Sequence, residues 1–222
     1  MMMIEPGFYN MDCMDGMAQF PDKFFELAIV DPPYGIETRG HAQDRFRNGM
    51  QLDTVNDAKP NAKYFRELFR VSKNQIIWGY NHLSDMLPKC REFVFWYKHQ
   101  PVVTFADGEL AWTSFQRTAR FFDHPYFGGT NTEKDKIHPT QKPIALYKWL
   151  LSNYAKPGDK ILDTHVGSAS SLIACHQMGF ESWGFELDTD YYNAATERLN
   201  RAKAQVDIFE ACVTPKLEQI GM

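Results

Sequence analysis

The amino-acid sequence predicts an α/β fold in which a mostly parallel, twisted sheet carries helices on both faces and ends in an antiparallel edge. Three observations support this prediction. In the last third of the chain, strand-like and helix-like segments alternate at the spacing of parallel β-α-β units. Short apolar runs earlier in the chain have the composition of buried strands. Near the middle, two strand candidates lie on either side of a glycine, as an antiparallel pair would.

The first predicted elements surround a double proline. Residues 24–36 begin as a short β-rich run that the prolines stop, so Asp31 lies at the carboxyl end of a buried strand. The polar stretch 37–61 shows little periodicity and is expected to form a long loop. Apolar residues at helical spacing then predict a helix from about Asn61 to Phe69, followed by a strand at 75–78.

The middle of the chain contains the expected edge of the sheet. Strands are predicted at 93–97 and 109–113, with Gly108 between them, and they are expected to pair as an antiparallel edge. Residues 115–138 mix aromatic and basic residues without a period, which predicts an irregular segment. Pro143 is expected to be the first residue of a helix that continues to about Tyr154.

The last third supplies the parallel units. The elements expected there are a strand at 160–163, a helix at 170–178 closed by Gly179, a strand at 182–187, and a helix from 190 to about 203 capped by Asp188 or Thr189. Strands and helices in this order form a parallel sheet with helices packed on its faces.

Length and composition limit the classes of protein that fit. The 222 residues suit one domain spanning 1–222, and 44% hydrophobic with 23% charged residues is ordinary for a globular protein. No apolar stretch approaches the roughly 20 residues that cross a bilayer, so a cytoplasmic location without membrane contact is expected. The four cysteines are scattered, which predicts reduced thiols and no metal site. With a net charge of −4, a polyanionic partner would need local basic patches.

The segment Asp31-Pro32-Pro33-Tyr34 contains the candidate catalytic residues. Its two prolines fix two φ angles and remove two backbone donors, so a stiff turn presents the carboxylate and the phenol. These groups match an exocyclic amine on a flat heterocycle, because its N–H groups can bond Asp31 while Tyr34 stacks on the ring. Hydrogen bonds to the amine also support the charge that develops during its attack on an electrophile. An ordinary Asp-Pro-Pro turn without chemistry is the alternative.

A second candidate site is the turn Asp163-Thr164-His165-Val166-Gly167-Ser168 together with Glu186. Glycine at a strand-to-helix turn lets a ligand approach the backbone, and a carboxylate about 20 residues later can bind two ribose hydroxyls. No full G-x-G-x-x-G pattern is present, which favours a nucleoside cofactor without a pyrophosphate. A glycine needed only for packing would explain the same turn.

The third segment is His138-Pro139-Thr140-Gln141-Lys142-Pro143, directly before a predicted helix. It places a lysine near a helix N-terminus, where the dipole also favours an anionic group, so a ligand carboxylate could bind there. Alternatively, the segment only caps the helix, with Thr140 as the N-cap.

Together these segments resemble the S-adenosylmethionine-dependent amino-methyltransferases of DNA, of the D-P-P-Y type that modifies adenine N6. The order of motifs resembles the permuted order of one group of these enzymes, in which D-P-P-Y comes first and the cofactor strand last. The resemblance covers about Asp12 to Leu199 and includes the segments 76–81 and 184–188. It implies a single Rossmann-like methyltransferase domain, with S-adenosylmethionine as cofactor and DNA as partner.

The resemblance also implies roles for the matching residues. Asp31, Pro32, Pro33 and Tyr34 would hold and activate a flipped base, with Asp31 also bordering the cofactor. The cofactor would contact Asp12 near its adenine, Glu186 at its ribose, Asp163, Gly167 and Ser168 at its methionine part, and Lys142, with His138 and Thr140, at its carboxylate. Leu187, next to Glu186, is also expected to contact the cofactor. The family turn resembles D-P-F-x-G-S-G, whereas this chain has Thr164, His165 and Ala169 at three of its positions.

Two segments are expected to meet DNA, and both have a modest positive balance. Residues 37–48 contain Arg39, Arg45 and Arg47, and the short target-recognition segment 115–137 contains Arg117 and Arg120. Each of these arginines could equally lie on a solvated loop. The second segment is short for a recognition domain, which leaves open a brief target site or help from a second subunit in a homodimer.

Two other functions stay open from the sequence. The acceptor could be cytosine N4 or an amine in RNA, although Asp rather than Ser before Pro-Pro-Tyr favours adenine by resemblance. The altered turn 164–169 also fits a catalytically silent DNA-binding relative, which would show no thermal shift with S-adenosylmethionine.

Overall fold

One eight-stranded sheet organises the part of the chain that the structure describes. This computed structural model describes residues 3–35, 58–99, 106–126, 136–138 and 140–217, with side chains as far as residue 205. The N-terminal elements are β1 (Gly7–Asn10), α1 (Cys13–Met17), β2 (Phe25–Val30), α2 (Ala62–Val71), β3 (Ser72–Trp78), α3 (Tyr80–Leu83) and β4 (Phe93–Tyr97). The C-terminal elements are β5 (Gly108–Thr113), β6 (Arg120–Asp123), α4 (Ile144–Tyr154), β7 (Ile161–Asp163), α5 (Ser170–Met178), β8 (Ser182–Glu186) and α6 (Thr189–Leu217).

The sheet has a parallel half and a mixed half. Its strand order is β1-β8-β7-β2-β3-β5-β4-β6. The five neighbouring strands β1, β8, β7, β2 and β3 are all parallel to one another. Strand β5, in contrast, pairs antiparallel with both β3 and β4. These pairings confirm the predicted α/β class, with a mostly parallel sheet and an antiparallel edge region.

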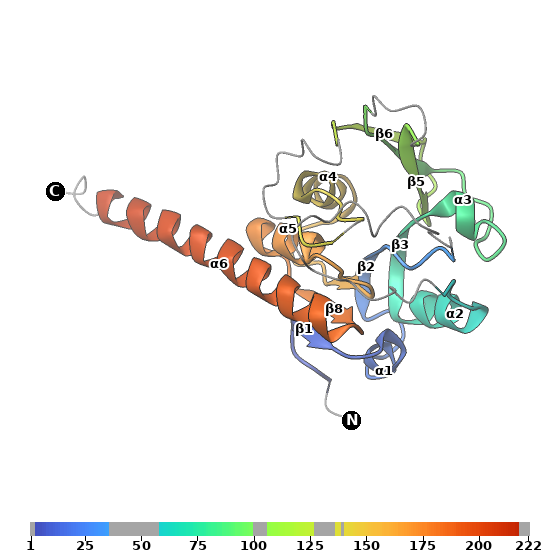
Figure 1. The fold of residues 1–222 in the computed structure, drawn as a ribbon, viewed down its shortest axis with the longest axis horizontal. Coiled ribbons are helices and arrows are strands. Elements are labelled where there is room, and N and C mark those ends of the chain that lie inside the picture. The colour runs from blue at the N-terminus through green and yellow to red at the C-terminus, as the bar shows by residue number, and fades with distance from the viewer. Residues whose placement is uncertain (1–2, 36–57, 100–105, 127–135, 139, 218–222) are drawn as a thin grey trace.

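Helices cover both faces of the sheet because β2 alternates its side chains between two cores. Leu27 and Ile29 pack in one core with α4 and α5, and Ala28 and Val30 pack in the other with α1 and α2. Figure 1 shows these helix pairs on opposite sides of the sheet, with α6 extending beyond it. None of the helices within the described ranges has the length and apolarity needed to cross a bilayer.

Local capping explains where several helices begin and end. The Asn61 side chain accepts hydrogen bonds from two amides of the first turn of α2, at 2.9 and 3.3 Å. Gly179 ends α5 with a left-handed φ of +73°. The Asp188 side chain accepts from the amides of Asp190 and Tyr191, each at 2.9 Å, so Asp188 is the cap of α6.

Several predicted boundaries need correction. The prediction of an irregular segment at 115–138 was wrong for Arg120–Asp123, which forms β6 parallel to β4. Only four residues long and without alternating polarity, this strand gave no periodic signal. The α6 helix also continues past Lys203 to Leu217, and Pro143 is the N-cap of α4 rather than its first residue. Most of the loop predicted at 37–61 lies outside the described residues.

Candidate active site

The predicted acidic residues meet at one edge of the sheet. The order β1-β8-β7-β2 places four parallel strands side by side, and their carboxyl ends lead into Asp12, Glu186, Asp163 and Asp31, respectively. Carboxyl ends of neighbouring parallel strands lie together, which is where open α/β sheets bind ligands. The negative charges of Asp31 and Glu186 both act on Asp163. The sheet therefore brings the predicted catalytic turn at Asp31 together with the predicted cofactor site at Asp163 and Glu186.

Asp163 is buried and bound by neutral donors. Its side chain accepts hydrogen bonds from the Ser171 hydroxyl at 2.5 Å and from the His165 amide at 3.0 Å. Burial raises the pKa of Asp163 to about 7, although these hydrogen bonds oppose the rise, and the charges of Asp31 and Glu186 add to it.

Glu186 joins the end of β8 to the turn after β7. Its carboxylate accepts from the Gly167 amide at 2.9 Å and from the Asp188 amide at 3.0 Å, and burial raises its pKa. Asp12 lies one strand away, where it caps α1 by accepting from the Met14 amide at 2.7 Å. Leu187 is exposed beside Glu186.

The turn between β7 and α5 is closely packed despite its departures from the family pattern. The Thr164 hydroxyl lies 2.6 Å from the Tyr64 hydroxyl and 2.9 Å from Nδ1 of His165. Burial lowers the pKa of His165 to about 4, so this ring is neutral at pH 7. Ala169, where the family turn has glycine, has a left-handed φ of +62°.

Ser168 and Gly167 fix the end of this turn. The Ser168 carbonyl accepts from the Arg198 guanidinium at 2.6 Å. Gly167 also has a left-handed φ, +53°, and a Cβ there would lie 3.8 Å from the His138 ring. The H-P-T-Q-K-P segment therefore lies directly against the turn after β7.

His138 and Thr140 form a local contact in that segment. His138 Nδ1 lies 3.1 Å from the Thr140 hydroxyl, and burial lowers the pKa of His138 to about 4. The alternative of Thr140 as the N-cap of the helix was wrong, because α4 starts at Ile144 with Pro143 in the cap position and no side-chain cap.

Lys142 occupies the centre of the site. Its ammonium contacts the Asp31 carboxylate, lies 3.1 Å from a Glu109 carboxylate oxygen, and lies 5.3 Å from the centre of the Trp78 ring. The side chain is only 3% exposed. In this structure Lys142 is therefore paired with two carboxylates of the protein itself, and its contact with a ligand carboxylate stays a prediction.

Tyr34 completes the catalytic turn. Its hydroxyl donates a hydrogen bond to the second oxygen of Asp31. Burial and the Asp31 charge raise the pKa of Tyr34 well above its usual value, so the phenol stays protonated. One part of the ring lies against Gly79, where a Cβ would be 2.1 Å from a ring carbon. The His82 ring stacks on Tyr34 at 5.3 Å between centroids.

The two prolines fix this turn by their position as well as their stiffness. Pro32 is buried and Pro33 is half-buried, directly between Asp31 and Tyr34.

Among the described residues, no group of three or more His, Cys, Asp and Glu side chains has an arrangement suited to a metal ion.

Sequence reasoning missed two residues of this site: Gly79 and Glu109. Gly79 lies within the predicted motif 76–81, where its left-handed φ of +78° at the end of β3 gives it a role. Glu109 ion-pairs with Lys98 as well as Lys142. That pairing depends on the register of β5 against β3 and β4, which no short sequence motif signals.

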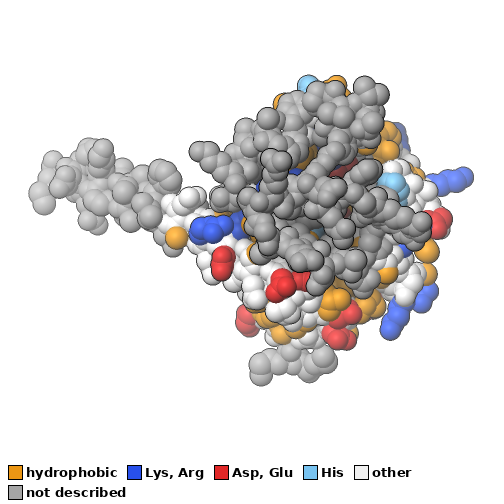
Figure 2. All heavy atoms as spheres, in the orientation of Figure 1, with side chains coloured by type: hydrophobic (Ala, Val, Ile, Leu, Met, Phe, Trp, Pro, Cys, Tyr) orange, Lys and Arg blue, Asp and Glu red, His pale blue; other side chains and the backbone are white. Residues whose placement is uncertain are grey.

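Two arginines that were predicted to bind DNA, Arg117 and Arg120, lie among the described residues, and both contact other side chains of this protein. Arg117 lies over the Tyr154 ring at 4.8 Å and ion-pairs with Glu92 at 3.4 Å. Arg120 donates to the Asn153 side chain. Arg39, Arg45 and Arg47 lie outside the described residues. On the face shown in Figure 2, the described Lys and Arg side chains are spread out, with Asp and Glu side chains between them.

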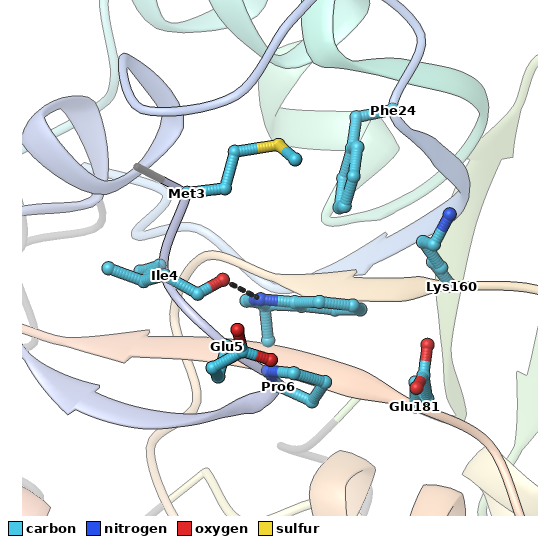
Figure 3. Close-up of a pocket in the computed structure, with 8 residues that line it drawn as sticks. Met3, Ile4, Glu5, Pro6, Phe24, Lys160 and Glu181 are labelled. Carbon is cyan, nitrogen blue, oxygen red and sulfur yellow. Dashed lines mark hydrogen bonds between the residues drawn. The ribbon is translucent and has the colours of Figure 1, made fainter. Parts of the chain in front are cut away.

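A separate hollow lies at the opposite edge of the sheet. Figure 3 shows Phe24 and Lys160 on one side of it. The Trp183 indole, which also lines the hollow, donates a hydrogen bond to the Ile4 carbonyl at 2.9 Å. Phe24, Lys160 and Glu181 directly precede the amino ends of β2, β7 and β8. This hollow is therefore remote from the carboxyl-end cluster.

Comparison with known proteins adds to this geometry. A family model described as DNA methylase matches residues 71–197, more than half of the chain. The putative methylase YubD of Escherichia coli (strain K12) is 24% identical over 208 residues, covering 86% of this chain and 89% of that protein.

Solved methyltransferase structures share the fold. The M1.HpyAVI–SAM complex superimposes with a TM-score of 0.57 at 20% identity, covering 86% of this chain and 98% of that one. The cytosine-N4-specific PvuII DNA methyltransferase gives a TM-score of 0.59 at 12% identity, covering 91% and 93%. Because the family model matches more than half of the chain, the chain belongs to the N6/N4 DNA methylase family, whose members are S-adenosylmethionine-dependent DNA amino-methyltransferases.

Proposed function

We propose that this chain transfers a methyl group from S-adenosylmethionine to the exocyclic N6 amine of an adenine that has left the DNA duplex. The observation that carries the proposal is the Asp31 carboxylate, held by the Tyr34 hydroxyl and the Lys142 ammonium at the edge where β7 and β8 also end. The Asp-Pro-Pro-Tyr sequence resembles that of adenine-modifying enzymes.

The charges at this edge fit S-adenosylmethionine. Four carboxylates gather at the ends of β1, β8, β7 and β2, and Asp31 and Glu186 both raise the pKa of Asp163. A ligand with a sulfonium cation would relieve this repulsion. The carboxylate of Glu186 keeps free lone pairs beside its two backbone donors, which leaves room for ribose hydroxyls.

We assign the cofactor contacts accordingly. Glu186 would bind the ribose, Asp12 and Leu187 would border the adenine, and the turn at Gly167 and Ser168 would hold the methionine part. When bound, S-adenosylmethionine supplies an electrophilic methyl group. His138 and Thr140 would border this site through the contact of His138 with Gly167.

Asp31 and Tyr34 would act on the base. Each carboxylate oxygen of Asp31 has a second lone pair, so Asp31 can accept a hydrogen bond from the adenine amine and still accept those from Tyr34 and Lys142. A hydrogen bond to the amine favours its attack because positive charge develops on that nitrogen as it binds the methyl carbon. An amine paired inside the duplex cannot reach this turn, so extrusion of the base is required, which costs a few kcal/mol.

The test is incubation of the protein with labelled S-adenosylmethionine and unmethylated duplex DNA, followed by nucleoside analysis. We expect labelled N6-methyladenine. Recovery of N4-methylcytosine alone would replace adenine by cytosine as the acceptor, a specificity carried by the PvuII neighbour. Label in RNA but not in DNA would overturn the DNA substrate.

Binding distinguishes an enzyme from a silent relative. Saturating S-adenosylmethionine should raise the thermal unfolding temperature, since a ligand that binds only the folded state stabilises it by mass action. No shift together with no methylated base would favour a DNA-binding protein without catalysis.

A further inference from the structure

We propose that Glu109 is a positioning residue that supplies a second negative charge to Lys142, so that this lysine orients Asp31 without neutralising the site. The inference rests on the proposed methyl transfer and extends it to a residue outside the recognised motifs.

The topology brings Glu109 to the catalytic edge. Strand β5 runs antiparallel to β3, so the start of β5 lies beside the carboxyl end of β3. The Gly79 amide, just after β3, donates to the Leu110 carbonyl at 3.0 Å. Glu109 is therefore next to the strand end whose glycine packs against Tyr34.

Four charged side chains of alternating sign form a continuous line, with the neutral Tyr34 phenol at one end. Tyr34 contacts Asp31, Asp31 contacts Lys142, Lys142 lies 3.1 Å from Glu109, and Glu109 contacts Lys98. Lys142 is 3% exposed, and Glu109 is 27% exposed. Since a buried ammonium needs compensating charge, Lys142 depends on both carboxylates.

The pKa values of the partners agree with this arrangement. Burial alone would raise the pKa of Glu109, but the ammonium groups of Lys142 and Lys98 hold it at about 2. Burial lowers the pKa of Lys142, whereas Asp31 and Glu109 raise it above its usual value. The Glu109 charge also acts at the Tyr34 phenol, whose pKa it raises together with burial and Asp31.

The consequence concerns the charge that the reacting nitrogen meets. During transfer the bond between sulfur and the methyl carbon breaks as the bond from nitrogen to carbon forms, and positive charge moves to the nitrogen, which then loses a proton to solvent. A lone Asp31–Lys142 pair is neutral and offers this cation little net attraction. With Glu109 these three groups carry a net charge of −1. Lys98 offsets that charge only from the far side of Glu109, since among the described interactions it contacts neither Lys142 nor Asp31, so the groups beside the reacting nitrogen stabilise its positive charge.

Glu109→Gln tests the proposal because it removes the charge with little change in shape. We expect the single-turnover rate of methyl transfer to fall at least about tenfold, with KM values for S-adenosylmethionine and DNA within about threefold of the wild type. Glu109→Asp, which restores the charge at a greater distance from Lys142, should recover part of the rate.

Lys98→Met separates charge from structural support. It breaks the same Lys98–Glu109 ion pair but leaves Glu109 charged against Lys142, so we expect a rate within about threefold of the wild type. If the pair served only to hold β4 against β5, Lys98→Met and Glu109→Gln would reduce the rate equally, and that result would overturn the proposal.

Glu92→Gln is the matched control. Glu92 is also buried, accepting from the Tyr154 hydroxyl at 2.8 Å and the Arg117 amide at 3.0 Å, but it has no contact with Lys142 among the described interactions. Its variant should keep the wild-type rate whatever its unfolding temperature.

The outcomes separate this inference from the proposed function. A wild-type protein that methylates no base defeats the proposed function, whereas an active wild type with an equally active Glu109→Gln variant defeats this inference alone. If Glu109→Gln does not fold, the comparison of Glu109→Asp with Lys98→Met tests the inference instead. We expect Glu109→Asp to lose about threefold or more of the transfer rate and Lys98→Met to lose none. Equal rates in these two variants would refute the inference.

Discussion

Asp31 and Asp163 end adjacent strands, β2 and β7, yet the protein surrounds them differently. Asp31 contacts an ammonium, that of Lys142, and a phenol. Asp163 is bound by a hydroxyl and a backbone amide, and burial raises its pKa to about 7. A paired cation supports an ionised carboxylate, whereas neutral donors leave much of the desolvation uncompensated. The surroundings of Asp31 suit a hydrogen-bond acceptor for a reacting amine. The surroundings of Asp163 suit a carboxyl group that a bound cationic cofactor would ionise.

The strongest test of this contrast is Asp31→Ala. Loss of the acceptor should reduce methyl transfer by about 1,000-fold or more, because the amine loses its hydrogen-bond acceptor and faces the Lys142 ammonium without the Asp31 charge between them. Affinity for S-adenosylmethionine, measured by calorimetry, should change little. Retention of normal turnover would remove Asp31 from the mechanism.

The contrast also shows what the sequence could predict. Asp31, Asp163 and Glu186 were found because each ends a strand whose apolar composition is visible locally. Glu109 was missed because its contact with Lys142 depends on the register of an antiparallel pairing. Lys142 was recognised as functional, but its partners were not, since a sequence shows a lysine near a helix start and not the carboxylates that surround it.

The same reasoning explains the errors in the fold. The helix α5 was predicted with its observed boundaries because Gly179 marks its end and apolar residues mark its length. Strand β6 was missed because four residues at a sheet edge are specified by their neighbour β4 rather than by their own pattern. Strand β1, four residues at the other edge of the sheet, was not predicted either, whereas β4 and β5 were predicted almost to the residue. Local signals therefore located the interior strands of the sheet better than its two edge strands.

Gly79→Ala tests how closely the Tyr34 side is packed. A Cβ at this position would lie 2.1 Å from the Tyr34 ring, and the φ of +78° adds backbone strain. We expect a loss of about 2 to 3 kcal/mol in the free energy of unfolding and at least a tenfold loss of turnover. Urea denaturation and methyl-transfer rates measure the two effects.

Gly158→Ala provides the matched control for that substitution. Its φ of +86° is similar, but a Cβ there would have no atom of the described residues within 4 Å. It should cost about 1 kcal/mol from backbone strain without affecting turnover. Equal effects of the two substitutions on turnover would show that the contact with Tyr34 has no catalytic importance.

Asp163→Asn tests the other aspartate through pH. A folded-state pKa of about 7, above the unfolded value, means that the folded protein binds the extra proton, so this group lowers stability as pH rises from about 4 to 7. Between pH 5 and 8 the wild type should lose on the order of 2 kcal/mol from Asp163. Asn keeps the shape without the charge and should remove that loss.

Urea denaturation of both proteins at pH 5 and pH 8 measures this difference. Burial lowers the pKa of His138 and His165 to about 4, so these residues contribute stability that is lost as pH falls below about 6.5. That contribution is common to the wild type and the variant and cancels in the comparison. An identical pH dependence in the two proteins would contradict the raised pKa of Asp163.

Glu186→Gln probes the smallest expected effect, on the cofactor side of the contrast. One oxygen can still accept from the Gly167 amide, but the negative charge and one acceptor are lost, so the Kd for S-adenosylmethionine should rise about tenfold. Glu181→Gln, at the opposite edge of the sheet before β8, should leave the Kd unchanged. Since Glu186 does not touch the base in this assignment, the transfer rate at saturating cofactor should also stay within about threefold of the wild type. An unchanged Kd for Glu186→Gln would exclude its ribose role and place the cofactor elsewhere along the acidic edge.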